Sequence, residues 1–196
     1  MSEIATERAK RSDAERNITA ILDAAVELLA EQPEASMAEI AAAAGVARQT
    51  VYAHYRSREA LLLAVAERAR AEAVAAIDAA EPERGPPLEA LARLVPAWWS
   101  SVERHARVLE ALAPSFPGAE ELHRFHAPIL ERVERLVRRG RRAGDFDREL
   151  PVAWLVAAFL GLMHAAADEV AAGRVSASAA GRSLERSVPR LFGVRD

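Results

Sequence analysis

The sequence predicts an all-α protein, and three of its features support that fold class. Apolar residues recur three and four positions apart, which is the spacing that gives a helix one buried side. A serine followed three residues later by a glutamate forms a capping-box pattern at Ser12–Glu15 and again at Ser36–Glu39. Helix-breaking residues separate the segments, most clearly in the sequence EPERGPP at 81–87. We therefore expect helices joined by short connections.

The first predicted helix starts near Asp13 and ends before Pro33. Residues 1–11 are polar, and we expect them to be disordered. The apolar stripe of this helix predicts that it packs behind the elements that follow, and its members are Ile18, Ile21, Leu22, Ala25, Leu28 and Leu29.

Residues 36–62, SMAEIAAAAGVARQTVYAHYRSREALL, hold two short helices joined by a tight turn. Ser36 caps the first helix, and Gly45 follows it at a point where a left-handed residue is needed. The second helix is expected from about Ala47 to Tyr55, and Ser57 can cap a third. This pattern is typical of a helix-turn-helix.

The second helix has two different faces. Ala47, Val51 and Tyr55 share the side that we expect to point inward. The outward side is short, polar and partly aromatic, with Gln49, Ala53 and Arg56 at its centre and Thr50 and Tyr52 beside it. Glutamine can pair with adenine, alanine can contact a thymine methyl group, and the other side chains can bind phosphates or base edges. The outward face therefore suits the major groove of DNA.

The run from Gly45 to Leu61, GVARQTVYAHYRSREAL, resembles the DNA-binding domain of TetR-type (TetR/AcrR-like) transcriptional regulators. Thr50, Tyr52 and His54 match the pattern of that family directly. Three positions depart from it: Arg58 replaces the usual lysine, Tyr55 the usual phenylalanine, and Ala47 a common serine or threonine cap. The close match covers about residues 13–62, and the remainder agrees in length and helical pattern.

This resemblance implies a homodimer that reads a pseudo-palindromic DNA operator, most often as a repressor released by a small molecule. Gln49, Thr50 and Tyr52 are the predicted base contacts, with Ala53 against a methyl group. The predicted phosphate contacts are Ser36, Arg48, Tyr52, His54, Arg56 and Arg58. The basic tail formed by Arg8, Lys10 and Arg11 is either a further DNA contact or a solvated terminus.

The predicted N-terminal domain covers residues 1–62, and a linking helix at about 57–80 connects it to a C-terminal ligand-binding and dimerisation domain at 83–196. In that domain we expect helices at about 88–104, 107–112, 119–142 and 178–191. Pro96 predicts a kink or a late start in the first of these. The arginines near the end of the third suit a helix C-terminus better than a second DNA-binding patch.

Residues 151–167 contain no charge, but this run is too short for a typical membrane span and contains His164. We expect a helix with one side in its own core and the other against a second subunit. The segments 151–171 and 178–191 are the predicted dimer interface, arranged with the partner's pair as a four-helix bundle.

Aromatic residues concentrate in the C-terminal half, which indicates either a packed core or a cavity for an apolar small molecule. His164 is either a satisfied core histidine or a polar group in that cavity. His123 and His126 could share a metal, but no third ligand is recognisable, so we expect no metal and no cofactor. The pocket candidates are Trp98, Trp99, Phe116, Phe125, Trp154, Phe159, Met163 and His164.

The chain of 196 residues has a net charge of −3, no cysteine and no secretory leader, so we expect a cytoplasmic protein. No phosphate-binding loop, catalytic triad or carboxylate pair is recognisable, and we expect no enzymatic activity. A DNA-binding regulator without a small-molecule effector is the main alternative. An all-helical enzyme and a purely structural dimer are the remote ones.

Overall fold

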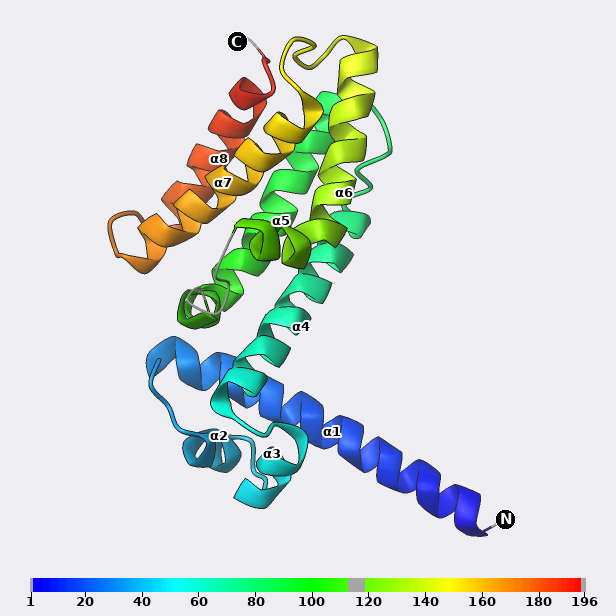
Figure 1. The fold of residues 1–196 in the computed structure, drawn as a ribbon, viewed down its shortest axis with the longest axis vertical. Helices are drawn as coiled ribbons and strands as arrows, with labels where there is room; N and C mark the ends of the chain where they lie inside the picture. Colours follow the sequence, from blue (N-terminus) through cyan, green and yellow to red (C-terminus); the bar gives the residue numbers. More distant parts are fainter. Residues whose placement is uncertain (1, 113–118, 195–196) are drawn as a thin grey trace. The chain divides into compact units, whose positions relative to one another are not determined.

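The computed structural model describes residues 2–112 and 119–194, and all regular structure among them is helical, as predicted (Figure 1). The chain divides into two compact units. One comprises Met1–Arg68 with Arg107–Ala113, and the other comprises Ala69–Ala106 with Pro114–Asp196. The long helix α4 (Arg58–Ala79) contributes residues to both units. Phe116, one of the pocket candidates, lies outside the described residues.

The N-terminal unit contains α1 (Ser2–Glu31), α2 (Met37–Ala43), α3 (Arg48–His54) and the first part of α4. The prediction of a disordered segment at 1–11 was wrong, because α1 already begins at Ser2. This segment is polar, but it contains neither glycine nor proline, and its Glu, Ala, Lys and Arg residues favour a helix. The core of the N-terminal unit combines residues from all four helices: Ile21, Leu29, Ile40, Val51, Leu61 and Val65.

The C-terminal unit contains the rest of α4, α5 (Pro87–Leu112), α6 (Ala119–Ala143), α7 (Val152–Ala171) and α8 (Ala177–Leu191). The predicted break between residues 104 and 107 was wrong, since α5 is continuous there and keeps Pro96 inside it. No glycine or proline separates the two segments, so nothing in the local sequence ends the helix there. A proline-containing helix can persist where tertiary packing supports it.

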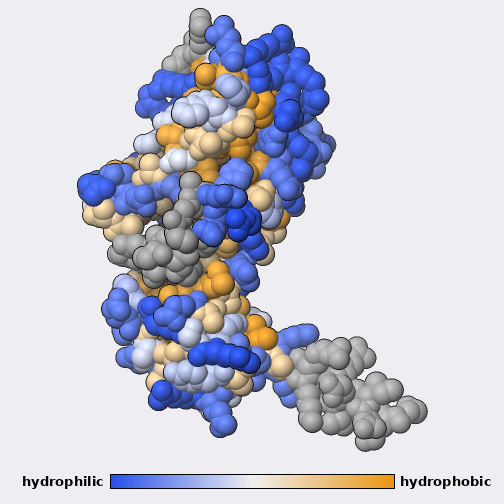
Figure 2. All heavy atoms as spheres, viewed as in Figure 1, coloured by the Kyte–Doolittle hydropathy of each residue, from blue (hydrophilic) through white to orange (hydrophobic). Residues whose placement is uncertain are grey.

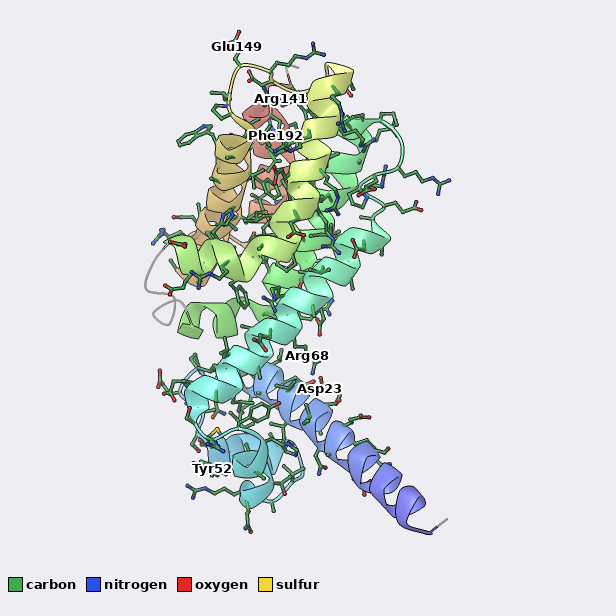
Figure 3. All side chains as sticks on the ribbon, turned by 45° about the vertical axis from the view of Figure 1, so that its right-hand side comes forward. Asp23, Tyr52, Arg68, Arg141, Glu149 and Phe192 are labelled. Atoms are coloured by element: carbon green, nitrogen blue, oxygen red, sulfur yellow. The ribbon has the colours of Figure 1, made fainter. Side chains whose placement is uncertain are left out.

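The core of the C-terminal unit is largely aromatic. Phe159 of α7 lies 5.3 Å from Trp98 of α5 and 6.0 Å from Phe192, measured between ring centroids. Phe192 in turn lies 5.3 Å from Phe146, and it is labelled at the end of α8 in Figure 3. These rings are almost fully buried. Because each buries a large apolar area, they account for much of the stabilisation of this unit.

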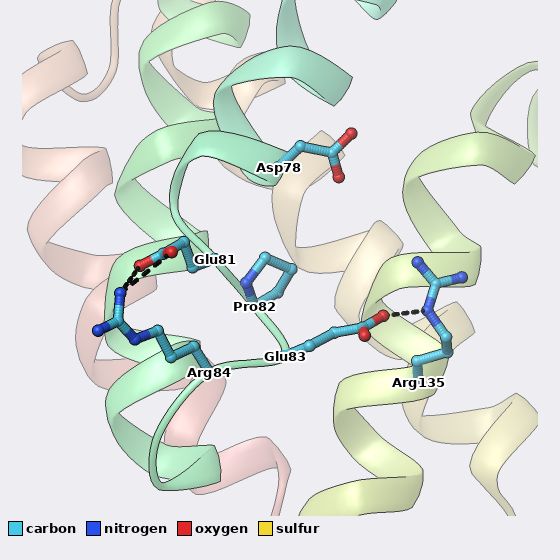
Figure 4. A pocket seen from close by; sticks show the side chains of 6 residues that line it. All are labelled: Asp78, Glu81, Pro82, Glu83, Arg84 and Arg135. Atoms are coloured by element: carbon cyan, nitrogen blue, oxygen red, sulfur yellow. Dashed lines mark hydrogen bonds and ion pairs between the residues drawn. The ribbon is translucent and has the colours of Figure 1, made fainter.

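The connection between α4 and α5 is held by two arginines. Arg93 donates to the carbonyl oxygens of Ala80, Glu81 and Arg84 at 2.9, 3.1 and 2.8 Å. Arg139 of α6 donates to that of Pro82 at 2.8 Å. Figure 4 shows the adjoining crevice of about 490 Å³, where Glu81 pairs with Arg84 and Glu83 with Arg135. The pairing satisfies these charges within the protein itself.

Only one side of α7 is buried in the described structure. Leu155, Phe159 and Met163 face the core, where α7 packs against α6 and α8. Trp154 is 60 % exposed, and Ala153, Ala157, Gly161 and Ala165 continue this exposed side. By length and composition α7 could cross a membrane, but the core helix of a soluble protein passes the same test. Figure 2 shows hydrophobic residues reaching the surface of this unit among hydrophilic ones.

Candidate nucleic-acid interface

The turn between α2 and α3 forms as its residues predict. The Ser36 hydroxyl accepts from the amide of Glu39 at 3.3 Å, and the Glu39 carboxylate accepts from the amide of Ser36 at 2.7 Å. The Ser36 hydroxyl also donates to the Glu39 carboxylate at 2.7 Å, and this bond, followed by the one from the Ser36 amide, holds the pKa of Glu39 below its usual value. Gly45 follows with φ of +67°, a conformation that costs other residues a steric clash. The capping box predicted at Ser36–Glu39 and the glycine turn are therefore confirmed, whereas the one predicted at Ser12–Glu15 was wrong, because both residues lie inside α1.

The helix α3 is seven residues long and is anchored by one side chain. Val51 is completely buried, whereas Tyr55, just beyond the helix, is only half-buried. Burial raises the pKa of Tyr55, and the charge of Arg68 opposes this shift. Ala47 was predicted to point inward but is exposed, because it is the N-cap and lies outside the helical periodicity. The cap lacks a side-chain hydrogen bond, so tertiary packing must hold the start of α3.

The outward face of α3 carries the predicted polar groups. Gln49, Ala53 and Arg56 are exposed, and Tyr52 is 40 % exposed. Figure 3 shows Tyr52 at the surface of the N-terminal unit. Thr50 and His54 are half-buried at the margins of this face. The arrangement leaves donors and acceptors of a short helix open to a partner, as major-groove reading requires.

Arg48 and Tyr52 lie together on this face, one helical turn apart. The guanidinium carbon of Arg48 lies 5.3 Å from the centroid of the Tyr52 ring. Its Nη2 lies 3.5 Å from the Tyr52 hydroxyl, at the outer limit of a hydrogen bond. A cation above an aromatic face is attracted by the ring quadrupole. The contact therefore biases both side chains toward one arrangement before any partner binds.

Arg58 makes contacts that the sequence did not reveal. Its Nε donates to the carbonyl oxygen of Ala35 at 3.3 Å, and its Nη2 donates to that of Pro33. A second long-range contact joins Arg68 of α4 to Asp23 of α1, and the two residues face each other in Figure 3. The paired residues are 23 to 45 positions apart, and helical periodicity does not relate residues over such distances. The sequence pattern therefore does not predict either contact.

The pocket candidates have different positions in the C-terminal unit. Trp98, Trp99, Phe159 and Met163 are buried in the core. Trp99 also donates from Nε1 to the carbonyl oxygen of Ala177 at 3.1 Å. Trp154 is mostly exposed and does not lie with these four candidates in the core. It lies on the side of α7 opposite the core, where helical periodicity places it.

Phe125 and His164 belong to a partly buried polar cluster. Arg70 lies over the Phe125 ring at 4.8 Å and donates to the Phe125 carbonyl oxygen at 3.1 Å. The ring of His126 lies 5.0 Å from that of His164, measured between centroids. The structure thus pairs His126 with His164 and leaves His123 exposed. Among the described residues, no three potential metal ligands come together.

The protonation of His126 follows from its surroundings. Its Nδ1 lies 2.8 Å from the carbonyl oxygen of Leu122, and because a carbonyl only accepts, Nδ1 carries the proton. The pKa of His126 is lowered to about 4, chiefly by burial; the hydrogen bond to Leu122 opposes this shift, and the charges of His164, Arg70 and His123 add to it. Burial also lowers the pKa of His164, against the effect of Asp168. His126 is therefore neutral near pH 7, and its Nε2 is a hydrogen-bond acceptor.

The capped α2, the glycine turn and the exposed polar face of α3 define the N-terminal unit as a helix-turn-helix module of the kind that reads DNA. The sequence model described as bacterial regulatory proteins of the tetR family matches residues 21–65, which are this module.

Comparisons with known proteins extend the likeness beyond the module. The repressor LfrR of Mycolicibacterium smegmatis is 48 % identical over 81 residues, or 41 % of this chain and 43 % of LfrR. The match thus spans less than half of that relative's length. The regulator NfxB of Pseudomonas aeruginosa is 26 % identical over 158 residues, or 81 % of this chain and 84 % of NfxB.

Solved structures show the same fold over almost the whole chain. The crystal structure of LfrR from Mycobacterium smegmatis in complex with proflavine has a TM-score of 0.63 and 30 % identity, covering 88 % of this chain and 95 % of that one. FadR of Bacillus subtilis in complex with stearoyl-CoA has a TM-score of 0.72 at 18 % identity, covering 91 % and 99 % of the two chains. This chain belongs to the tetR family of bacterial regulatory proteins.

Proposed function

We propose that the protein is a transcriptional repressor that binds a pseudo-palindromic operator as a homodimer and is released by a small molecule. The observation that carries this proposal is the exposed polar face of α3, supported by a capped α2 and a buried Val51. Family membership supports a regulatory role in the cytoplasm rather than a catalytic one.

In this proposal two copies of α3 enter successive major grooves about 34–36 Å apart. Gln49, Thr50 and Tyr52 contact base edges, and Ala53 lies against a methyl group. Exposed Arg48 and Arg56, with His54 and Ser36, contact phosphates. The net charge of −3 does not oppose this, because residues 46–62 carry three arginines and a single acidic residue, Glu59.

Fluorescence anisotropy tests the proposed DNA binding. The purified protein is titrated against DNA from upstream of its own gene, with an unrelated duplex for comparison. Gln49→Ala is expected to lose about 1–3 kcal/mol of specific binding. Gln32→Ala removes an exposed glutamine outside α3 and serves as the matched control. Equal loss in the two variants, or equal binding of the two duplexes, would contradict specific reading by α3 at this site.

The proposed dimer interface is the exposed side of α7 together with α8. Ala157, Gly161 and Ala165 form a strip of small residues there, and an added Cβ at Gly161 would meet nothing within the chain. Small side chains let two helices approach closely, and the exposed Trp154 at one end supplies a large apolar anchor. A four-helix bundle formed with a second copy would cover these residues.

Sedimentation equilibrium tests this interface. Trp154→Arg is expected to shift the protein from dimer to monomer, because it places a charge in an apolar contact. Leu63→Arg changes a similarly exposed apolar residue on α4 and should leave the dimer intact. A dimer that persists in Trp154→Arg would move the interface elsewhere.

The proposed effector site lies near the cluster of Arg70, Phe125, His126 and His164, beside Trp98. The aromatic rings of Trp98 and Phe125 suit an apolar small molecule, which Arg70 and the two histidines would orient. Proflavine and stearoyl-CoA, present in the structures of LfrR and FadR, are the first two probes. An effector should weaken operator binding by about 1–3 kcal/mol, and the operator should weaken effector binding equally.

A regulator without an effector is the second candidate, because Trp98, Phe159 and Met163 already pack against one another as core. Thermal unfolding with each probe separates the two. A shift that disappears in His164→Leu supports the effector site. No shift with a wider panel of apolar compounds would favour the second candidate.

A further inference from the structure

Arg58 stands at the first residue of α4, immediately after Ser57, whose hydroxyl accepts from the amide of Ala60 at 3.2 Å. Its side chain does not extend freely into solvent. It is half-buried and runs back to the connection between α1 and α2, more than 20 residues earlier in the chain. There its Nε and Nη2 donate to the carbonyl oxygens of Ala35 and Pro33.

These two acceptors lie in a five-residue connection, Gln32 to Ser36, in which the first and last carbonyl groups are used locally. The carbonyl oxygen of Gln32 accepts from the amide of Ala35 at 3.0 Å, and that of Ser36 accepts from the amide of Ile40 at 3.0 Å. Ala35 is almost fully buried. A polar backbone group near buried surface is costly without a partner. Arg58 supplies that partner for the carbonyl oxygens of Pro33 and Ala35.

The chemistry of the contact depends on arginine. Nε and Nη2 lie on one edge of a rigid planar group, so a single guanidinium can hold two carbonyls two residues apart in a fixed relation. A lysine ammonium is a point charge on a flexible stem and lacks this geometry. Charge alone would serve for a phosphate contact, but it would not reproduce this bridge.

The connection that Arg58 holds leads directly into α2. Ser36 caps α2, Met37 and Ile40 anchor it in the core, and α2 packs against α3. Arg58 therefore links the start of α4 to the start of α2. In the sequence, these two points lie on either side of α3, the helix proposed to read DNA. We propose that Arg58 is a positioning residue that fixes α2, and through it α3, for DNA reading, and that it is not a phosphate anchor. This inference rests on the proposed DNA-binding function.

Arg56 offers a matched control, because it is an exposed arginine two residues away in the same module. Three full-length variants are compared: Arg58→Gln, Arg58→Lys and Arg56→Gln. For each, amide hydrogen exchange is measured over residues 34–40, and the Kd for the operator is measured at several salt concentrations. All measurements are made well below the melting temperature of the least stable variant.

Both Arg58 variants are expected to exchange roughly fivefold faster over 34–40, since a local hydrogen-bonded tie is lost. Both should raise the Kd by roughly fivefold, and Arg58→Gln should leave the salt dependence of binding unchanged. Arg56→Gln should leave exchange unchanged and reduce the slope of log K against log salt by about 0.9, the value for one phosphate contact. If Arg58→Gln does not fold, Arg58→Lys carries the comparison.

Two results would overturn the proposal. In the first, Arg58→Lys keeps the original Kd and exchange while Arg58→Gln reduces the salt slope as Arg56→Gln does, which identifies a phosphate anchor. In the second, exchange rises in both Arg58 variants but the Kd does not change. Arg58 would then stabilise the α1–α2 connection without positioning α3 for DNA reading. If the unmodified protein binds no operator, the proposed function fails, and faster exchange in the variants would still establish the tie.

Discussion

The two units use their aromatic side chains in opposite ways. In the N-terminal unit, Tyr52 is 40 % exposed on a seven-residue helix that only Val51 anchors in the core. In the C-terminal unit, Phe159 is fully buried and lies within 6.0 Å of two other rings. The first arrangement leaves the aromatic surface available to a partner, whereas the second buries it in internal packing. Exposure therefore indicates function in one unit, while aromatic composition in the other indicates mainly stability.

The C-terminal unit should respond most strongly to a change in packing volume. Gly140→Ala places a Cβ in the space of the buried Phe146 ring, so the ring or the helix must move. We expect a loss of about 3 kcal/mol or more in the free energy of unfolding, measured by urea denaturation. Glu121→Ala is the control, because it changes an exposed side chain on the same helix. Similar losses in both variants would mean that the interior is less tightly packed than the contacts indicate.

The buried histidine should make the same unit sensitive to acid. The pKa of His126 is about 4 in the fold against 6.5 in its absence, so the unfolded chain binds this proton more readily. Its contribution to stability is complete above pH 6.5 and is lost as the pH falls toward 4, by about 1–3 kcal/mol. Denaturation of His126→Gln across this range should show a weaker pH dependence. His123→Gln removes an exposed histidine and should behave like the unmodified protein.

In the N-terminal unit the expected effects are smaller and concern helix ends. Ala47→Ser adds an acceptor at an N-cap whose φ of −64° and ψ of 144° already suit one. We expect about 1 kcal/mol of stabilisation, seen as a higher melting temperature. Ser36→Ala removes the existing cap of α2 and should cost a similar amount. A null result at Ala47 would show that tertiary contacts alone set the start of α3.

The smallest expected effect is the coupling between Arg48 and Tyr52. Their exposed contact should contribute about 0.5 kcal/mol to operator binding beyond the separate effects of the two side chains. A double-mutant cycle with Arg48→Gln and Tyr52→Leu measures this term. Strict additivity would mean that the two side chains contact DNA independently.

Much of the architecture could be predicted because its signals are local. Helix periodicity, the Ser36–Glu39 box and the glycine turn act within a few residues, so the helix-turn-helix was predicted with its exposed face. The errors arose where local signals were weak. The start of α1 and the continuity of α5 depend on helix propensity in segments that have no clear apolar pattern.

The sequence by itself determined the fold class, the helix-turn-helix and the composition of the reading face, because the interactions that form them span one or two helical turns. Only the tertiary structure decided that Arg58 holds the α1–α2 connection and that His126 faces His164. These relations join helices that are far apart in the chain. They depend on how whole helices pack, and packing follows from the shapes of many side chains together.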